Sequence, residues 1–266
     1  FVERFGWFLV DSERRKRVVV RVQGQRLASL SSAANGHFEF PVLEVIGHPG
    51  EWLPVTLEST YAGHGVIRGH FQLVPEKGLT VISDIDDTVK ISEVLDRKAL
   101  VRNIFVNDYE VAPGMPAFYR TLAEQGAFFH YLSASPWQLY TGLQSFLDSH
   151  YPQGSLSLRH FRLGDQSFWD FFHSSMDYKL ASIRERMQRF PGQQFIFIGD
   201  SGERYPEVYA QIYSEFPQQV ERIFIRKVPD SDLSQERLDR VFGDVPQGKW
   251  RLFDEPGGLG IGAQIQ

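Results

Sequence analysis

The residues best suited to chemistry lie in the string "SDIDDT", where three aspartates fall within four positions directly after an apolar run. Asp84 and Asp86 are two residues apart, so in an extended segment their side chains point the same way. Two converging carboxylates suit a hard cation such as Mg²⁺, which takes oxygen ligands. A solvated acidic turn explains an isolated pair equally well. A calcium loop is excluded, because the sixth and twelfth positions hold Val89 and Leu95 instead of Gly and Glu.

Three further candidates follow later in the chain. Ser133 comes directly after "FFHYL", where its hydroxyl and nearby backbone N–H groups can bind an anion. Asp200 follows "FIFI" in the string "GDSGE". Lys179 is the only lysine between them, and its ammonium can hold a phosphate as a point charge. Taken singly, the three have ordinary alternatives: a turn or cap serine, a loop acid and a solvated helix lysine.

An alternation of apolar and helix-like segments from residue 77 onward must position these residues. Strands are expected at 79–83, 128–132, 195–198 and 222–225, and helices at 115–124, 136–148, 178–190 and 207–215. Ser135 and Pro136 are expected to start the second helix, as a capping residue and a first-turn proline. This alternation predicts a Rossmann-like α/β domain whose parallel sheet is covered on both faces. Ligands bind outside the carboxyl ends of such strands, where three of the candidates are expected to gather.

The preceding residues, 1–76, are different in pattern. Short β-type runs such as "RVVVRV" at 17–22 and "HFEF" at 37–40 are separated by glycine-containing turns. We therefore predict two domains, a small β-sandwich-like one at 1–76 and the α/β domain at 77–266.

Composition narrows the functional class. Hydrophobic residues make up 42% and charged residues 23% of the 266 positions, which excludes a disordered chain. The net charge of −5 argues against nucleic-acid binding, and the lack of cysteine excludes disulfides, zinc–thiolate sites and cysteine nucleophiles. No apolar run approaches the ~20 residues that span a bilayer. We expect a cytoplasmic protein with peripheral contact to membranes; export stays open, because a targeting segment upstream of Phe1 would not be visible.

The order Asp-x-Asp-x-Thr, Ser, Lys and Gly-Asp resembles the four motifs of the haloacid dehalogenase superfamily of phosphohydrolases. Three longer strings, "ISDIDDTVKISEV", "FHYLSASPWQLY" and "FIFIGDSGERYPEVYAQI", are similar to the catalytic domain of the actin-patch phosphatidate phosphatase family. The resemblance extends over about residues 61–228 and implies a haloacid dehalogenase core in the second domain.

The resemblance also implies residue roles. Asp84 would be the nucleophile that forms an aspartyl-phosphate, and Asp86 the general acid and base. Ser133 and Lys179 would bind the transferring phosphoryl group, and Thr88 would order the loop beside it.

A magnesium site is implied as well. Its ligands would be Asp84, the backbone carbonyl of Asp86, and Asp200. One position departs from the family pattern, because Tyr205 stands where an acid usually precedes the Pro-Glu-x-Tyr string. Either Glu203 substitutes for that acid or the enzyme is weakened. We predict that Tyr205→Asp raises the Mg²⁺ affinity, unless Tyr205 packs under the loop.

The substrate class follows in part from chain length. The segment between Asp84 and Ser133 is too short for a second folded domain, so we expect an uncapped site that accepts a bulky partner. The resemblance implies phosphatidate as the substrate and diacylglycerol as the product. Two alternatives stay open: the same chemistry on a soluble phosphomonoester or phosphoprotein, and a catalytically weak binding or adaptor module. The aromatic string "SFWDFF" at 167–172 predicts either interfacial contact or buried packing.

Overall fold

The structure, a computed structural model, describes residues 15–33, 36, 45–59, 65–159, 175–257 and 259. The chain divides into two compact units, one formed by Phe8–Pro75 and a larger one that includes Glu76–Gln266. No helix within the described ranges has both the length and the apolar character needed to cross a bilayer.

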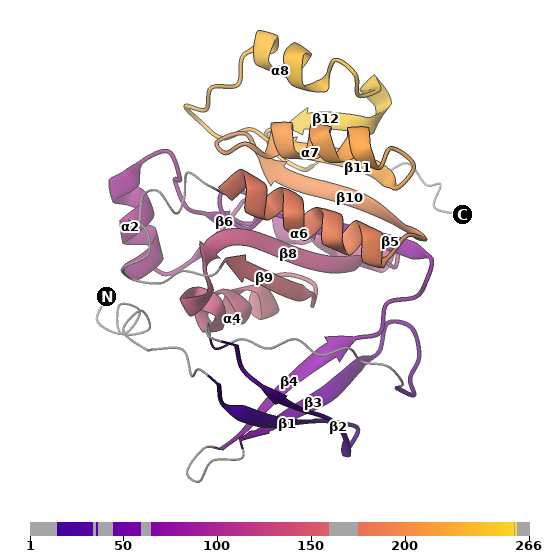
Figure 1. The fold of residues 1–266 in the computed structure, drawn as a ribbon. Coiled ribbons are helices and arrows are strands. Elements are labelled where there is room, and N and C mark those ends of the chain that lie inside the picture. Colours follow the sequence, from indigo (N-terminus) through magenta and orange to yellow (C-terminus); the bar gives the residue numbers. More distant parts are fainter. Residues whose placement is uncertain are drawn as a thin grey trace. The chain divides into compact units, whose positions relative to one another are not determined.

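The smaller unit is an antiparallel sheet in the order β2-β1-β3-β4 (Figure 1). Its strands are β1 (Arg17–Val22), β2 (Gln25–Ser31), β3 (Trp52–Ser59) and β4 (Val66–Gln72). Gln23 and Gly24 have φ of 50° and 78° and form the tight turn from β1 to β2. The β-rich character is as predicted. A sandwich requires a second sheet, and the described residues of this unit form only one. The strand expected at 37–40 lies outside the described residues.

The larger unit contains a six-stranded sheet in the order β12-β11-β10-β5-β8-β9, in which every neighbouring pair is parallel. The strands are β5 (Gly78–Ser83), β8 (Phe128–Pro136), β9 (Ser155–Arg159), β10 (Gln193–Asp200), β11 (Val220–Arg226) and β12 (Trp250–Phe253). The four strands predicted from the sequence form the centre of this sheet, and β9 and β12 add its edges. The α/β class is therefore confirmed.

Helices and short elements connect these strands. The helices are α2 (Arg97–Phe105), α3 (Met115–Glu124), α4 (Tyr140–His150), α6 (Ser175–Arg189), α7 (Tyr205–Glu215) and α8 (Gln235–Phe242), with short 3₁₀ turns η1 (Trp137–Leu139) and η2 (Gln247–Lys249). Between β5 and α3, the strands β6 (Lys90–Ile91) and β7 (Glu110–Val111) pair antiparallel and enclose α2.

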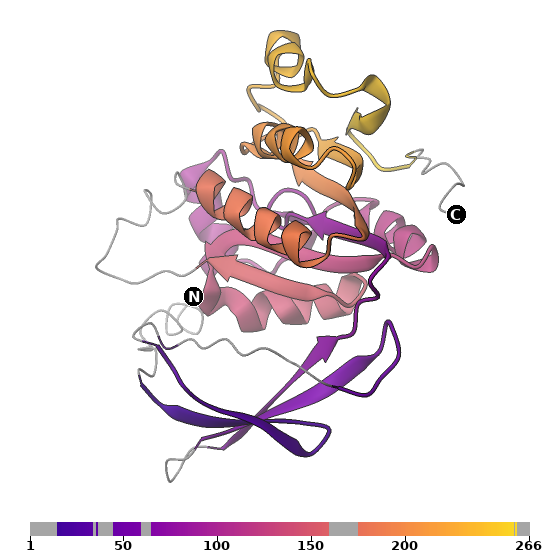
Figure 2. The same cartoon turned by 45° about the vertical axis from the view of Figure 1, so that its right-hand side comes forward.

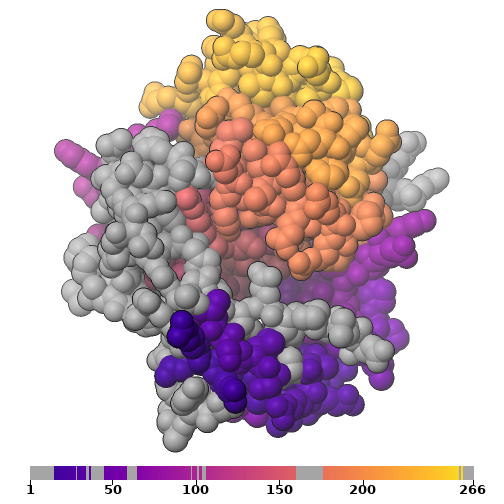
Figure 3. Space-filling model, in the orientation of Figure 1, coloured from indigo at the N-terminus to yellow at the C-terminus, as the bar shows by residue number. Residues whose placement is uncertain are grey.

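Both faces of the parallel sheet are buried. On one face, Ile183 of α6 and Val208 and Ile212 of α7 belong to the same core as Phe195 and Phe197 of β10. Figures 1 and 2 show α6 and α7 side by side on this face, and the space-filling view shows their outer surface (Figure 3). A sheet covered on both faces requires continuous apolar strands, which accounts for the nearly uninterrupted burial of β5 and β10.

The opposite face is packed by α3. Tyr119 of this helix stacks on Phe129 and Tyr131 of β8, and the adjacent Phe118 meets Phe224 of β11 edge-on. Successive residues of β8 and β10 thus alternate between two packed layers.

The predicted helix start at Ser135 and Pro136 is wrong. Strand β8 continues through both residues, and Pro136 is paired in register with Arg159 of β9. The Ser135 hydroxyl donates to Asp86 Oδ2 at 2.9 Å, and α4 begins without a side-chain cap. The Ser135 hydroxyl, which the local pattern assigned to a helix cap, instead binds the carboxylate of Asp86, a residue far away in the sequence.

Candidate active site

The sheet order brings the predicted residues to one edge. Strand β5 lies between β10 and β8. Asp84 directly follows β5, Asp200 is the last residue of β10, and Ser133 lies near the end of β8. The Asp84 N–H donates to the carbonyl of Ile198 at 2.9 Å, which extends the β5–β10 pairing by one residue. All three polar side chains are buried.

Each carboxylate oxygen of Asp84 accepts one hydrogen bond. Oδ2 accepts from the Thr88 hydroxyl at 2.8 Å, and Oδ1 accepts from the Tyr205 hydroxyl. Thr88 reaches back because the N–H groups of residues 88–90 all donate to the Ile85 carbonyl in a tight turn. Thr88, predicted to order the loop, therefore contacts Asp84 itself.

Asp84, Asp200 and Glu203 form an acidic cluster whose ligand atoms lie within 4.8 Å of one another. The Asp200 Oδ1 accepts the N–H groups of Gly202 and Glu203 at 2.6 and 2.9 Å. The Asp200 Oδ2 is buried and has no hydrogen-bond partner among the described residues. A hard divalent cation would satisfy this oxygen and offset the repulsion among the three carboxylates, so the acidic cluster fits such an ion.

The protonation behaviour of the acidic cluster follows from its burial. Burial raises the pKa of Asp84 well above its ordinary value; the charge of Lys179 opposes this shift and that of Asp200 adds to it. Burial likewise raises the pKa of Asp200 to about 7, with a further contribution from the charge of Glu203. Both carboxyl groups therefore bind a proton more readily than an exposed aspartate does when no cation stands beside them.

The Asp86 carboxylate has hydrogen-bond partners of its own. Its Oδ1 accepts from Lys90 Nζ at 2.9 Å and Ser92 Oγ at 2.7 Å, and its Oδ2 accepts from the hydroxyls of Ser133 and Ser135, both at 2.9 Å. Burial acts to raise the pKa of Asp86, but the Lys90 charge and these hydrogen bonds hold it well below the ordinary value.

Two predicted site residues make contacts that the sequence did not indicate. Four donors engage the Asp86 carboxylate, and the third carboxylate of the acidic cluster is Glu203. The predicted metal ligand at position 86 is the backbone carbonyl, so these side-chain contacts leave that prediction standing. Ser133, predicted to bind phosphate, donates its hydroxyl to Asp86. It can turn to a phosphate only if that bond is exchanged.

Lys179 is buried and does not extend into solvent. Its Nζ lies 2.6 Å from Glu203 Oε2 and 3.6 Å from the centre of the Tyr205 ring. Burial acts to lower its pKa, but the charges of Glu203 and Asp84 outweigh burial, so the pKa of Lys179 is raised. The predicted lysine is therefore a charged member of the site.

Lys90 and Ser92 were not singled out from the sequence. Both follow the aspartates in "DDTVKIS", and both are buried, with Lys90 Nζ donating to Ser92 Oγ. The available signal was the two-residue spacing of Asp86, Thr88, Lys90 and Ser92. It was weak, because β6 is only two residues long.

Tyr205 was singled out as a departure from a pattern, and the structure shows it packed beneath the loop. It is fully buried, and a Cβ added to Gly199 would lie 2.7 Å from the Tyr205 Cγ. A carboxylate in place of this tyrosine would be buried beside Asp84, so Tyr205→Asp is expected to destabilise the metal-free protein. This packing is the exception under which the gain in Mg²⁺ affinity is not expected.

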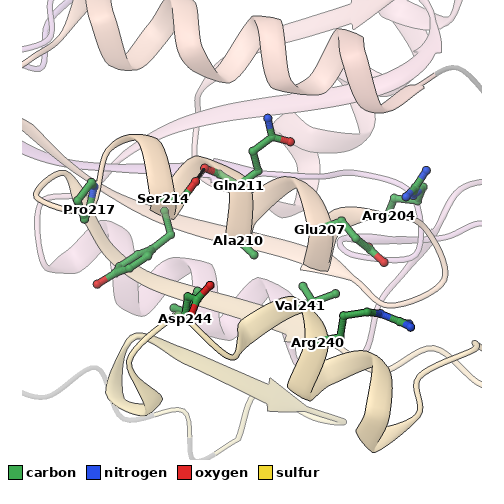
Figure 4. A pocket seen from close by; sticks show the side chains of 11 residues that line it. Arg204, Glu207, Ala210, Gln211, Ser214, Pro217, Arg240, Val241 and Asp244 are labelled. Atoms are coloured by element: carbon green, nitrogen blue, oxygen red, sulfur yellow. Dashed lines mark hydrogen bonds between the residues drawn. The ribbon is translucent and has the colours of Figure 1, made fainter.

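A groove between α7 and α8 is a separate feature (Figure 4). It has a volume of about 840 Å³, and the residues that line it include no member of the acidic cluster. Arg204, Glu207 and Arg240 gather toward one end, Pro217 lies at the other, and Ala210 lies between them. The segment 167–172, predicted to be an aromatic patch or buried packing, lies outside the described residues.

Comparisons with known proteins agree with the motifs. The profile of the family described as "Phosphatidate phosphatase APP1, catalytic domain" matches residues 79–227. The chain is 35% identical over 179 residues to Phosphatidate phosphatase APP1 of Saccharomyces cerevisiae, which covers 65% of this chain and 30% of that protein. It is 30% identical over 182 residues to an uncharacterized protein of Schizosaccharomyces pombe, which covers 65% of this chain and 29% of that protein. The chain thus spans about a third of the length of these relatives.

A solved structure is also similar in part. It is the class C acid phosphatase from Bacillus anthracis, with a TM-score of 0.35 and 14% identity over 64% of this chain and 80% of that one.

Proposed function

We propose, since the chain belongs to the phosphatidate phosphatase APP1 catalytic-domain family, that it is a Mg²⁺-dependent phosphomonoester hydrolase acting on phosphatidate. The observation that carries this proposal is the buried Asp84, placed at a strand end within the acidic cluster and beside Lys179. The substrate assignment rests on family membership. A phosphatidate substrate would be met at a membrane surface, to which the protein would bind peripherally.

Asp84 is the proposed nucleophile. One of its oxygens forms a bond to phosphorus while the bond to the diacylglycerol oxygen breaks, which leaves an aspartyl-phosphate. Water then attacks this phosphorus, releases inorganic phosphate and restores the carboxylate. Splitting the displacement in this way replaces one difficult step with two easier ones.

The anionic nucleophile and the anionic substrate repel each other, so positive charge must lie close to both. Mg²⁺ would be held by Asp84, Asp200 and the backbone carbonyl of Asp86, with Glu203 beside them, and would supply charge neutralisation when bound. Lys179 adds a fixed ammonium on the same side, because Glu203 and the Tyr205 ring hold it in place.

Asp86 is the proposed general acid and base. In the arrangement described, Lys90 keeps it ionised, which suits the removal of a proton from the attacking water. To protonate the leaving alkoxide it must first gain a proton, and the exchange of its hydrogen bonds with Ser133 and Ser135 for contacts with substrate would favour that form.

The test is phosphate release from phosphatidate in mixed micelles, with and without Mg²⁺, set beside soluble phosphomonoesters and a phosphopeptide. We expect Mg²⁺-dependent release that is fastest from phosphatidate. Asp84→Asn should lower turnover by more than ~10³-fold, because an amide oxygen is a poor nucleophile. Faster release from a soluble phosphate would contradict the substrate, and near wild-type turnover by Asp84→Asn would contradict the covalent mechanism. No turnover on any substrate would favour a binding or adaptor module.

A further inference from the structure

Tyr205 contacts both the proposed nucleophile, Asp84, and the lysine beside it, Lys179. We infer, on the basis of the proposed function, that Tyr205 is a positioning residue that orients the Asp84 carboxylate and the Lys179 ammonium together. Its hydroxyl donates to Asp84 Oδ1, and its ring faces Lys179 Nζ.

The hydroxyl fixes the plane of the nucleophile. Thr88 donates to one Asp84 oxygen and Tyr205 to the other, from two different segments of the chain. A carboxylate held at both oxygens cannot rotate freely about its Cβ–Cγ bond. Each oxygen keeps a second lone pair, so one of them is left free to meet phosphorus in a defined direction.

The ring fixes the lysine. The distance of 3.6 Å from Lys179 Nζ to the ring centre is well inside the ~6 Å range of cation–π attraction. Glu203 holds the same ammonium at 2.6 Å. Without the ring, the nearby carboxylates alone would position the ammonium.

Tyr205 is itself held firmly. It is the first residue of α7, which packs on β10 beside α6 (Figure 1). Its ring lies 5.3 Å from that of Tyr209, and the close approach to Gly199 leaves no room for a Cβ there. A buried ring with this support can set the geometry of its neighbours to within a few tenths of an ångström.

Tyr209 provides a matched control. It is on the same helix and equally buried, and its hydroxyl also makes one hydrogen bond, to the Ile198 carbonyl at 3.0 Å. Tyr205→Phe and Tyr209→Phe thus each remove one buried hydroxyl, but only the first removes a donor to Asp84. Tyr205→Leu removes the ring as well.

The experiment measures kcat and KM at saturating Mg²⁺, the rate of phosphoenzyme formation in acid-quenched single turnovers, and thermal melts. For Tyr205→Phe we expect kcat and phosphoenzyme formation to fall by ~10-fold with KM changed less than ~2-fold, because orientation is lost and substrate contacts are not. In Tyr205→Leu, kcat and the rate of phosphoenzyme formation should fall by ~100-fold or more. Tyr209→Phe should lose a similar number of degrees in Tm as Tyr205→Phe and keep its kcat.

Other results overturn the inference. Equal or faster turnover by Tyr205→Phe would mean that the hydroxyl obstructs Asp84 or does nothing for it. Equal losses in both phenylalanine variants, or a Tyr205→Phe protein that does not fold where Tyr209→Phe does, would assign Tyr205 a structural role. A wild-type protein without turnover defeats the proposed function and the inference with it, whereas an active wild type with an unaffected Tyr205→Phe defeats the inference alone.

Discussion

Two aspartates two residues apart have opposite electrostatic environments in this site. Asp84 is buried among other acids, and burial raises its pKa. Asp86 is also buried, but Lys90 and the hydroxyls of Ser92 and Ser133 hold its pKa well below the ordinary value. Residue type therefore does not decide the charge of these groups; their neighbours do. The difference between the two pKa values suits the proposed roles. Asp84, the nucleophile, would be ionised when a cation binds beside it, whereas Asp86, the base, is kept ionised by Lys90.

Lys179→Met should lower turnover by ~10²-fold or more, because the variant loses the ammonium that faces the acidic cluster. It should also destabilise the metal-free protein by roughly 1–3 kcal/mol, since it leaves the partner carboxylate of Glu203 without its cation in a partly buried setting. Turnover and thermal melts with and without Mg²⁺ measure both effects, and added Mg²⁺ should recover part of the stability.

Lys227→Met is the control, because Lys227 pairs with Asp254 on the surface. The free energy of unfolding of Lys227→Met should match that of the wild type within ~0.5 kcal/mol. Wild-type turnover by Lys179→Met would return this lysine to the role of a structural ion-pair partner.

At the level of single residues, the sequence predicted where polar groups gather but not how they pair. Asp84, Ser133 and Asp200 were found because each follows an apolar run, and strand ends in a parallel sheet meet at one edge. Asp86 was expected beside Asp84, and the sequence did not indicate its contacts with Lys90, Ser92 and two serines of β8, because β5 ends at Ser83 and the alternation of an extended strand stops there. The pairing of Asp86 with Lys90 depends on the tight turn after Ile85, which the weak two-residue spacing of these side chains does not predict.

At the level of elements, the loop after β5 is tied to its surroundings through its acids. Asp87 has a φ of 54°, and its carboxylate accepts the N–H groups of Ser92, Glu93 and Val94 at 2.7–2.9 Å. Arg226 at the end of β11 donates to the Asp87 carbonyl at 2.7 Å. The sequence located the strands on either side of this loop, but the tertiary contacts that shape it come from β8 and β11, far away in the chain.

Lys90→Met should destabilise the protein by ~3 kcal/mol at pH 7, because it leaves the buried Asp86 carboxylate without its cation. The pKa of Asp86 is lowered in the folded protein, so the stability from this pair is present above the unfolded pKa of about 4 and is lost as the pH falls toward the lower folded value. The difference between variant and wild type should therefore shrink below pH ~4. Urea denaturation at pH 7 and pH 3.5 measures it. A difference that is the same at both pH values would show that Lys90 acts through packing and not through charge.

At the level of the whole molecule, the acidic cluster joins separate parts of the α/β unit. Asp84 follows β5, and Asp200 and Glu203 lie at the end of β10 and in the turn that leads to α7. A ligand bound by all three couples its binding free energy to the folding of this unit, because the unfolded chain does not hold the three carboxylates together. Stability should therefore report cation binding independently of catalysis.

The final prediction concerns the effect of Mg²⁺ on thermal stability at different pH values. Because burial raises the pKa of Asp200 to about 7, the native metal-free protein holds a proton more tightly than the unfolded chain, and its stability should fall as the pH rises from ~4 to ~7. Mg²⁺ binds the ionised carboxylates, so the rise in Tm that it produces should be small at pH 5 and several degrees at pH 8.

Asp200→Asn removes this ionisable group. The metal-free Tm of this variant at pH 8 should exceed that of the wild type, and the response of its Tm to Mg²⁺ should largely disappear. Asp254→Asn, at an exposed position, should behave as the wild type does. An equal Mg²⁺ response in Asp200→Asn and the wild type would place the cation elsewhere, and a Tm gain that is larger at pH 5 than at pH 8 would mean that proton release from the acidic cluster does not control binding.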